Sequence, residues 1–259
     1  MGLPEGSVVW VTGAGSGIGR ACAIAFAKMG ARVALTGRRL PPLEETASII
    51  RELNGQSALV VPADVADPDA VAAALRTIVE RLGDPLVLIN SAGGNVKRRH
   101  WRDVSPESVS NVIDQDLKAL FYCTLAVLPA MRSRGDGRIV HIGSLAGVSL
   151  QTVTGPTYSA SKHGVVAMSA SLNAEEGIHG IRSICISPGE VETPILDTRP
   201  SPPSAAERKL MLQPEDVAET ALFCVSLPQR ACATHVILLP TDDRHVRESA
   251  RAIEALAAN

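Results

Sequence analysis

The sequence is built from short, uninterrupted apolar runs that alternate with longer segments of helical periodicity. Residues 86–89, for example, read Leu-Val-Leu-Ile, with no polar residue between the apolar ones. Strands of this kind are buried on both faces and belong to parallel sheets covered by helices. The alternation predicts an α/β fold, a doubly wound, seven-stranded parallel sheet flanked by helices. The strands are expected at residues 8–12, 32–36, 58–62, 86–90, 138–143, 181–187 and 235–239, and the helices at 18–29, 41–53, 67–82, 106–134, 157–177, 214–226 and 245–257.

Length and composition limit what such a fold can be. The chain has 259 residues, 46% of them hydrophobic, which fits a single domain over residues 1–259. A net charge of −2 gives no long-range attraction for nucleic acid. The five cysteines include no C-x-x-C pair, so neither a disulfide framework nor a metal site is expected. Because no apolar run reaches the roughly 18 residues of a membrane span and no secretory signal is present, we expect a cytoplasmic location and no membrane partner.

One segment, residues 190–212, breaks the alternation of strands and helices. It is rich in proline and serine, shows no clear period and follows the end of a predicted strand. Long irregular insertions in compact domains often cover binding sites. The segment is therefore expected to form a substrate lid, and the alternative is an ordinary surface loop.

A glycine-rich turn joins the first predicted strand to the first predicted helix. Residues 12–19 read Thr-Gly-Ala-Gly-Ser-Gly-Ile-Gly, so Gly13, Gly17 and Gly19 fit the spacing T-G-x-x-x-G-x-G rather than G-x-G-x-x-G. Glycine permits a tight turn and the close approach of a phosphate, and the amino end of the following helix favours negative charge. The turn predicts a Rossmann-like dinucleotide site, and the alternative is a tight turn that binds nothing.

Further motifs lie near the ends of predicted elements. Residues 90–93 read Asn-Ser-Ala-Gly, Ser144 follows the fifth strand, Tyr158 and Lys162 are four residues apart, and Pro188-Gly189 follows the sixth strand. In this order the motifs resemble the short-chain dehydrogenase/reductase (SDR) family over nearly the whole chain. The resemblance implies an NAD(P)-dependent oxidoreductase that transfers a hydride between the cofactor and a small-molecule ketone or secondary alcohol by a Ser-Tyr-Lys mechanism. It also implies a homotetramer or homodimer formed through the helices at 106–134 and 157–177.

The glycine turn and the resemblance also indicate the cofactor site. In the family, Asp64 and Val65 would contact the adenine and Thr193 the nicotinamide carboxamide. The residues expected to bind the cofactor are Gly13, Gly15, Ser16, Gly17, Ile18, Gly19, Arg38, Asp64, Val65, Asn90, Ala92, Gly93, Tyr158, Lys162, Pro188, Gly189, Val191 and Thr193.

The end of the second strand bears on which nicotinamide cofactor binds. In such folds an acidic residue there accepts from the ribose 2′-OH, whereas an arginine accommodates a 2′-phosphate. No carboxylate is present, and Arg38 and Arg39 follow the strand. NADP(H) is therefore favoured over NAD(H). Ser16 argues the other way, because NADP-preferring relatives often have a basic residue at that place, and the two arginines could simply be solvated.

The expected catalytic residues are Ser144, Asp116, Tyr158 and Lys162. The last two lie one turn apart on one face of a predicted helix. A free tyrosine has a pKa of about 10 and is a poor base, but a nearby ammonium favours the phenolate and makes it usable as a general acid and base. Ser144, at the carboxyl end of a strand, is placed to donate to a substrate oxygen. The alternative for Tyr158 and Lys162 is an ordinary helical pair.

Two positions depart from the family pattern. Asp116 replaces an asparagine that, in the family, helps to hold a water linking the lysine to solvent. An aspartate would still accept from that water, but its charge would hold Lys162 protonated and oppose the phenolate. We expect a working relay with an alkaline-shifted pH profile; the alternative is tolerated variation without effect. At residues 238–243, Leu-Leu-Pro-Thr-Asp-Asp replaces the family's Asp-Gly-Gly, which puts the subunit contacts in doubt.

The basic run Lys97-Arg-Arg-His100-Trp101 lies near the predicted mouth of the site. It would either meet an anionic substrate or form a solvated loop, and the second is favoured because charge runs usually face water. Trp101 is expected to pack on the site or an interface. His141 is expected to be a satisfied core histidine, and His163 is given no role.

The fold alone leaves two other functions open. One is a non-redox dehydratase or epimerase that reuses the bound cofactor. The other is a nucleotide-sensing binder without catalysis, against which the intact set of Ser144, Tyr158 and Lys162 argues.

Overall fold

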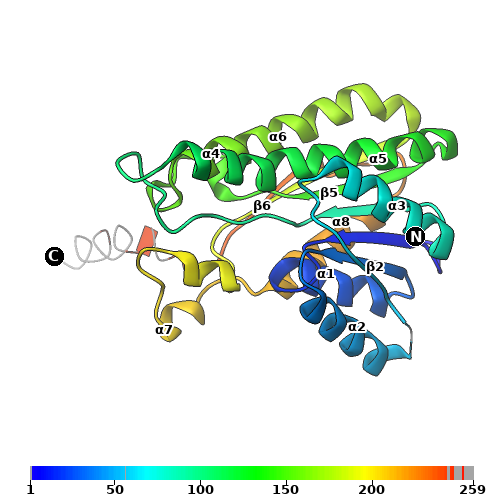
Figure 1. Cartoon of the computed structure of the whole chain (residues 1–259), viewed down its shortest axis with the longest axis horizontal. Helices are drawn as coiled ribbons and strands as arrows, with labels where there is room; N and C mark the ends of the chain where they lie inside the picture. Colours follow the sequence, from blue (N-terminus) through cyan, green and yellow to red (C-terminus); the bar gives the residue numbers. More distant parts are fainter. Residues whose placement is uncertain (1, 56, 244–245, 248–252, 254–259) are drawn as a thin grey trace.

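The chain folds around the predicted parallel sheet (Figure 1). The structure, a computed structural model, describes residues 2–55, 57–243, 246–247 and 253. The strands are all parallel, in the order β3-β2-β1-β4-β5-β6-β7. This confirms the predicted fold class, and each strand end lies within one residue of its prediction. The bounds are β1 Val8–Thr12, β2 Arg32–Gly37, β3 Leu59–Pro62, β4 Val87–Asn90, β5 Gly137–Ile142, β6 Ile181–Pro188 and β7 His235–Leu238.

Helices cover both faces of the sheet (Figure 1). Helices α1, α2 and α8 pack on one face, and α3, α5 and α6 on the other. Their bounds, with those of α4 and α7, are α1 Gly17–Lys28, α2 Leu40–Asn54, α3 Pro68–Leu82, α4 Pro106–Ile113, α5 Ala119–Arg134, α6 Pro156–Glu176, α7 Ala205–Arg208 and α8 Pro214–Ser226. The helix predicted over 245–257 lies mostly outside the described residues. Among the described residues, no helix is both long and apolar enough to cross a membrane.

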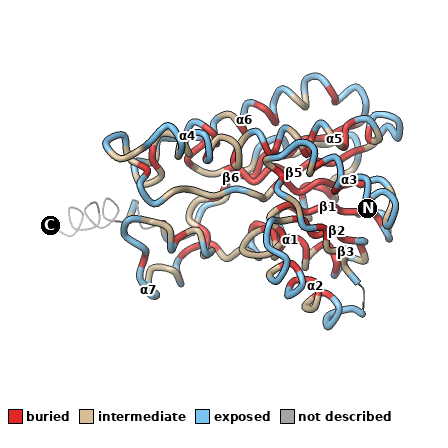
Figure 2. Tube along the Cα trace, viewed as in Figure 1, coloured by how far each residue is buried: buried red, intermediate tan, exposed pale blue. Residues whose placement is uncertain are grey.

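The core has two parts because each strand buries both of its faces. In β1, Val9 and Val11 pack with α1, α2 and α8, whereas Val8 and Trp10 pack with α3, α5 and α6. Figure 2 shows the central strands buried and the helices buried only along the side that faces the sheet. The uninterrupted apolar runs are thus the consequence of a sheet covered on both sides.

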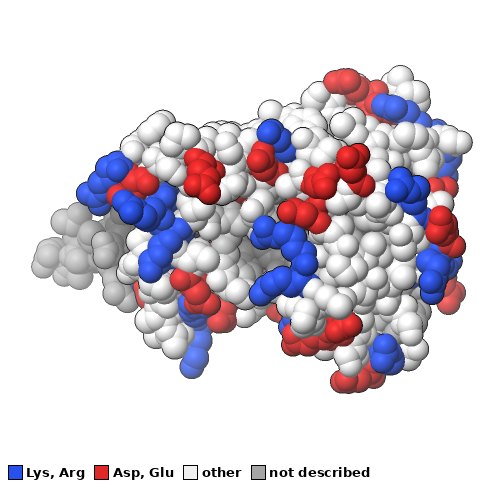
Figure 3. Space-filling view, viewed as in Figure 1, with Lys and Arg blue, Asp and Glu red and all other residues white. Residues whose placement is uncertain are grey.

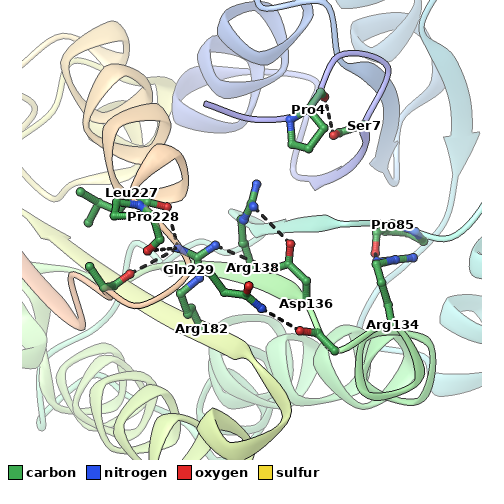
Figure 4. A network of polar contacts seen from close by, with 12 residues as sticks. Pro4, Ser7, Pro85, Arg134, Asp136, Arg138, Arg182, Leu227, Pro228 and Gln229 are labelled. Atoms are coloured by element: carbon green, nitrogen blue, oxygen red, sulfur yellow. Dashed lines mark hydrogen bonds and ion pairs between the residues drawn. The ribbon is translucent and has the colours of Figure 1, made fainter. Parts of the chain in front are cut away.

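The amino ends of β5 and β6 are held by a polar network that lies away from the carboxyl ends of the strands (Figure 4). Asp136 lies 3.2 Å from the Nη2 of Arg138 and 3.7 Å from the Nη2 of Arg182. Arg182 also donates to the carbonyl oxygen of Leu227 at 2.8 Å, and Gln229 donates to that of Gly135. These contacts tie the segment after α8 to the sheet and leave the opposite end of the strands for binding.

Two predicted segments differ from expectation in a way that matters for the site. The predicted helix over 106–134 is interrupted by a π-helical turn, Asp114–Lys118, between α4 and α5. The segment at 190–212 is not wholly irregular, because it contains a 3₁₀ turn at Pro194–Thr198 and helix α7. Its two ends meet in an isolated parallel bridge between Val191 and Leu212. The segment therefore leaves the rest of the fold and rejoins it at the same place, beside the carboxyl end of β6.

Candidate active site

A pocket of about 570 Å³ opens at the carboxyl ends of β1, β4, β5 and β6. The strand order reverses between β1 and β4, where open α/β sheets bind their ligands. Figure 3 shows a hollow near the middle of the face in view, with Lys and Arg side chains at its edge. The predicted site residues that line the pocket are Gly13, Ser16, Gly17, Ile18, Arg38, Gly93, Asp116, Ser144, Tyr158, Lys162, Pro188, Gly189, Val191 and Thr193.

The glycine turn forms one wall of this pocket with its backbone. Gly13 has a φ of +66°, and a Cβ on it would lie 2.8 Å from the carbonyl oxygen of Ser91. A Cβ on Gly19 would overlap the carbonyl oxygen of Gly13, and one on Gly17 would lie 3.0 Å from the Cγ2 of Thr193. The first N–H groups of a helix have no intrahelical partner, so the start of α1 presents donors here. This wall fits the phosphates of a dinucleotide.

Thr12, at the end of β1, joins the glycine turn to the loop after β4. Its hydroxyl accepts from the backbone N–H groups of Ser91 and Ala92, both at 3.1 Å, and donates to the carbonyl of Ile89 at 3.3 Å. The side chain is fully buried. It satisfies two backbone donors at the point where the two loops must approach each other.

Tyr158 and Lys162 lie one turn apart on α6, as the sequence predicts. The Lys162 ammonium lies 5.5 Å from the centre of the Tyr158 ring and donates to the carbonyl of Ile142 at 3.0 Å. Burial lowers the pKa of Lys162, but the charges of Tyr158 and Asp116 outweigh it, so the net shift is upward. Ser144 follows β5 and lines the same pocket, with its Oγ accepting from the N–H of Ala146.

Asp116 enters the pocket from the π-helical turn and is completely buried. Its Oδ1 accepts from the N–H of Gly94 at 2.9 Å and lies 3.7 Å from the Lys162 ammonium. Burial raises the pKa of this carboxyl to about 6, although Lys162 and the Gly94 N–H act to lower it. Its Oδ2 is buried and has no hydrogen-bond partner among the described residues. Turns of π-helix recur at functional sites, and here the turn brings a titratable group to Lys162.

Asn90 and His141 form a polar pair inside the sheet. The Asn90 amide lies 3.2 Å from the Nδ1 of His141 and donates to the hydroxyl of Thr124. Burial, then the charge of Lys162, lowers the pKa of His141 to about 3, which keeps the ring neutral. The Nε2 of His141 is buried and unpartnered among the described residues, so the expectation of a satisfied core histidine holds for one nitrogen only. His163 is exposed and bonds the Ser159 carbonyl.

Six residues predicted to bind the cofactor do not line the pocket wall. Gly15 and Gly19 shape the glycine turn from behind, and the Asn90 side chain turns toward α5. Asp64 lies exposed after β3, where it caps the N–H of Ala66. The residues in question are Gly15, Gly19, Asp64, Val65, Asn90 and Ala92, and their contact with a cofactor stays a prediction.

The basic run at 97–101 divides into parts with different environments. Lys97 and Arg98 are exposed, as expected of a solvated loop. Arg99 contradicts that expectation, because only 5% of it is exposed and it lines the pocket. Trp101 is 82% exposed and does not line the pocket, so the expected packing on the site is wrong.

Sequence reasoning missed several residues of the wall. Glu190 and Arg199 form an ion pair there, from within the segment at 190–212. Arg99 had a signal in the basic run, but nothing local separated it from its neighbours. The other missed residues of the wall include Asn95, Val96, Asn111, Val112, Gln115, Ile195, Leu196 and Thr198.

Comparison with known proteins agrees with this geometry. A family model described as short chain dehydrogenase matches residues 7–203. An uncharacterized oxidoreductase of Staphylococcus aureus (strain USA300) is 31% identical over 233 residues, which are 90% of this chain and 96% of that protein. The structure of levodione reductase superimposes with a TM-score of 0.84 at 28% identity, covering 91% of this chain and 96% of the other. The actinorhodin polyketide ketoreductase, solved with NADPH, gives a TM-score of 0.81 at 31% identity, covering 92% and 97%.

The chain belongs to the short-chain dehydrogenase family, which confirms the resemblance seen in the sequence. It is an NAD(P)-dependent oxidoreductase of the dehydrogenase/reductase type.

Proposed function

We propose that this enzyme interconverts a ketone and a secondary alcohol with NADP(H), using Ser144, Tyr158 and Lys162. The observation that carries the proposal is the meeting of these three side chains in one pocket with the glycine turn. When bound, the nicotinamide supplies or accepts the hydride of this redox reaction. The glycine turn and the first turn of α1 would hold its phosphates.

Each of the three side chains has a role that follows from its environment. The Tyr158 hydroxyl gives a proton to the carbonyl oxygen during reduction and takes it back during oxidation. Lys162, held by the Ile142 carbonyl, keeps a positive charge beside the tyrosine ring and stabilises the phenolate. Ser144 donates to the same substrate oxygen and orients it. The segment at 190–212 covers the pocket as a lid, because Leu196 and Arg199 line the wall.

A panel of ketones and secondary alcohols, followed by the absorbance of reduced nicotinamide, tests the proposal. We expect turnover of at least one ketone with NADPH and of its alcohol with NADP⁺. Binding of NADPH without turnover of any carbonyl or alcohol would contradict it and favour a nucleotide sensor. Loss of water or inversion of a centre without net change in cofactor absorbance would instead show a non-redox enzyme.

The charge at Arg38 predicts the cofactor preference. Arg38 is exposed and lines the pocket after β2, where an arginine accommodates a 2′-phosphate. We expect Arg38→Gln to raise the Kd of NADPH by about 10- to 100-fold, the loss of a hydrogen bond to a charged group. The Kd of NADH should stay unchanged, because NADH lacks the phosphate. Fluorescence titration with each cofactor measures both.

Arg39→Gln is the matched control for this experiment. Arg39 is the next residue, is exposed as well, and does not line the pocket. The control should leave both dissociation constants unchanged. If Arg38→Gln raises the Kd of NADPH and of NADH by the same factor, Arg38 does not bind the 2′-phosphate.

The buried carboxyl of Asp116 predicts a shifted pH profile. Its pKa of about 6 means that it gains its charge as the pH rises through that value. The charge then favours protonated Lys162 and opposes formation of the Tyr158 phenolate. We expect Asp116→Asn to move the acid limb of kcat/KM for alcohol oxidation to lower pH, by on the order of one pH unit. Initial rates between pH 5 and pH 10, roughly the range in which such groups titrate, measure it.

Asp114→Asn is the control for this profile. Asp114 lies in the same π-helical turn but forms a surface ion pair with Lys118 at 2.8 Å. Its replacement should leave the acid limb in place. If the acid limb of kcat/KM stays in place in Asp116→Asn, the Asp116 carboxyl has no electrostatic influence on Tyr158.

A further inference from the structure

Arg99 is a buried cation on the pocket wall without an acidic partner among the described residues. Its Nη2 donates to the carbonyl oxygen and the hydroxyl of Thr198, at 2.7 and 3.2 Å. Both acceptors are neutral. The Nε is buried and has no hydrogen-bond partner among the described residues. Burying an uncompensated charge is costly, so this guanidinium is poised to meet an anion.

The position of Arg99 assigns it to the substrate end of the pocket. Its backbone packs against Gly155, which has a φ of +78° and whose Cβ would overlap the Arg99 carbonyl oxygen. Gly155 immediately precedes α6, three residues before Tyr158. Thr198, to which the guanidinium donates, lies in the segment at 190–212. Arg38, by contrast, follows β2, on the other side of β1 in the sheet.

The neighbouring charges indicate which anion fits. Arg199 also lines this wall, but Glu190 compensates it in an ion pair, and Lys162 lies beside Asp116. Among the residues that the structure describes, these pairs leave one net positive charge, that of Arg99, at this end. Burial and the like charge of Arg199 lower the pKa of Arg99. A bound anion would offset both effects and stabilise the charged guanidinium. A single net charge matches a monoanionic carboxylate better than a dianionic phosphate.

We infer that the substrate is an oxo acid, or the corresponding hydroxy acid, whose carboxylate binds Arg99 while its carbonyl faces Tyr158. This inference rests on the proposed carbonyl reduction. The planar guanidinium presents its N–H donors in a fork that suits a carboxylate. Apolar side chains of the same wall, Val112, Ile195 and Leu196, would contact the carbon chain between the two groups.

The test compares oxo acids with their methyl esters, which keep the carbonyl and lose the charge. Wild-type enzyme with NADPH should prefer the acid of a matched pair, across 2-, 3- and 4-oxo acids. Arg99→Gln should lower kcat/KM for the preferred acid by about 10- to 100-fold, the loss of a hydrogen bond to a charged group. The same variant should keep kcat/KM for the ester within a factor of about three of the wild-type value, because the ester has no carboxylate to bind Arg99.

Arg98→Gln is the matched control, because it removes the same charge from the adjacent residue, whose side chain is 81% exposed. This control should change kcat/KM for neither the acid nor the ester. If Arg99→Gln slows the acid and the ester equally, Arg99 only holds the lid through Thr198 and the inference is wrong. Preference for a phosphorylated ketone over the oxo acid would also overturn it.

A binding measurement separates this inference from the proposed function. Hexanoate and hexanamide, titrated into the enzyme with NADP⁺, compare a carboxylate with a neutral isostere and need no turnover. We expect hexanoate to bind more tightly, and Arg99→Gln to abolish the difference. Reduction of neutral ketones together with equal binding of both probes would refute the carboxylate site alone. Selective hexanoate binding without reduction of any carbonyl would refute the proposed function and leave the carboxylate site standing.

Discussion

Replacing Tyr158 with phenylalanine is expected to lower kcat for carbonyl reduction by about 10²- to 10⁴-fold, the contribution of a positioned general acid. The substitution removes one oxygen and keeps the ring, which lies 5.5 Å from the Lys162 ammonium. The positive charge of Lys162 beside this ring eases the loss of the hydroxyl proton. The loss should therefore fall on kcat, while NADPH binding, measured by fluorescence titration, stays nearly unchanged.

Tyr122→Phe provides the control, because Tyr122 is the other of the two tyrosines in the chain. It lies on α5, packed at the edge of the core and away from the pocket wall. This variant should keep wild-type kcat. Retention of a tenth or more of the activity in Tyr158→Phe would mean that another group delivers the proton, and the roles given to Tyr158 and Lys162 would have to be abandoned.

The fold could be predicted closely because its determinants are local. Each strand of a sheet covered on both faces must be apolar throughout, so the run at 86–89 marks its own strand. The π-helical turn at Asp114–Lys118 could not be predicted in this way. The helical period continues on both sides of the turn, which shifts only its phase, and residues 106–134 therefore read as a single helix.

The part of the pocket formed by the glycine turn, Tyr158 and Lys162 could also be predicted from the sequence. Tyr158 and Lys162 share one helical face, and the glycine turn is a contiguous motif, so each can be recognised without tertiary information. Even here the environment of a side chain was not fixed by its motif. Asn90 turns its amide toward His141 and Thr124 in the interior, although its place in the Asn-Ser-Ala-Gly stretch suggested the cofactor path.

The part of the pocket around Arg99 could not be predicted because it is assembled from distant segments. Arg99 and Thr198 are 99 residues apart, and Thr198 lies in the segment at 190–212, whose two ends meet in the bridge between Val191 and Leu212. Arg98 and Arg99 look alike in the sequence, but Arg99 packs against Gly155 and Thr198 and is buried, whereas Arg98 is exposed. Burial, rather than residue type, distinguishes an arginine of the pocket wall from a solvated charge.

A methyl group at Gly19 is expected to disable cofactor binding without touching a catalytic side chain. The added Cβ would overlap the Gly13 carbonyl oxygen, a backbone atom that cannot move without opening the glycine turn. We expect Gly19→Ala to destabilise the fold by about 1–3 kcal/mol, as overpacking does. Displacing the first N–H groups of α1 should also raise the Kd of NADPH by about 100-fold, the loss of one or two charge-assisted hydrogen bonds.

Urea unfolding and NADPH titration measure the two effects of Gly19→Ala separately, and Gly177→Ala is the control for both. Gly177 follows α6 with a helical φ of −58°, and a Cβ on it would meet nothing within 4 Å. That variant should match the wild type in both measurements. If Gly19→Ala loses stability but keeps its NADPH affinity, the first turn of α1 does not hold the phosphates. The dinucleotide would then have to be held mainly by the loops after β4 and β6, and the wall formed by the glycine turn would serve folding alone.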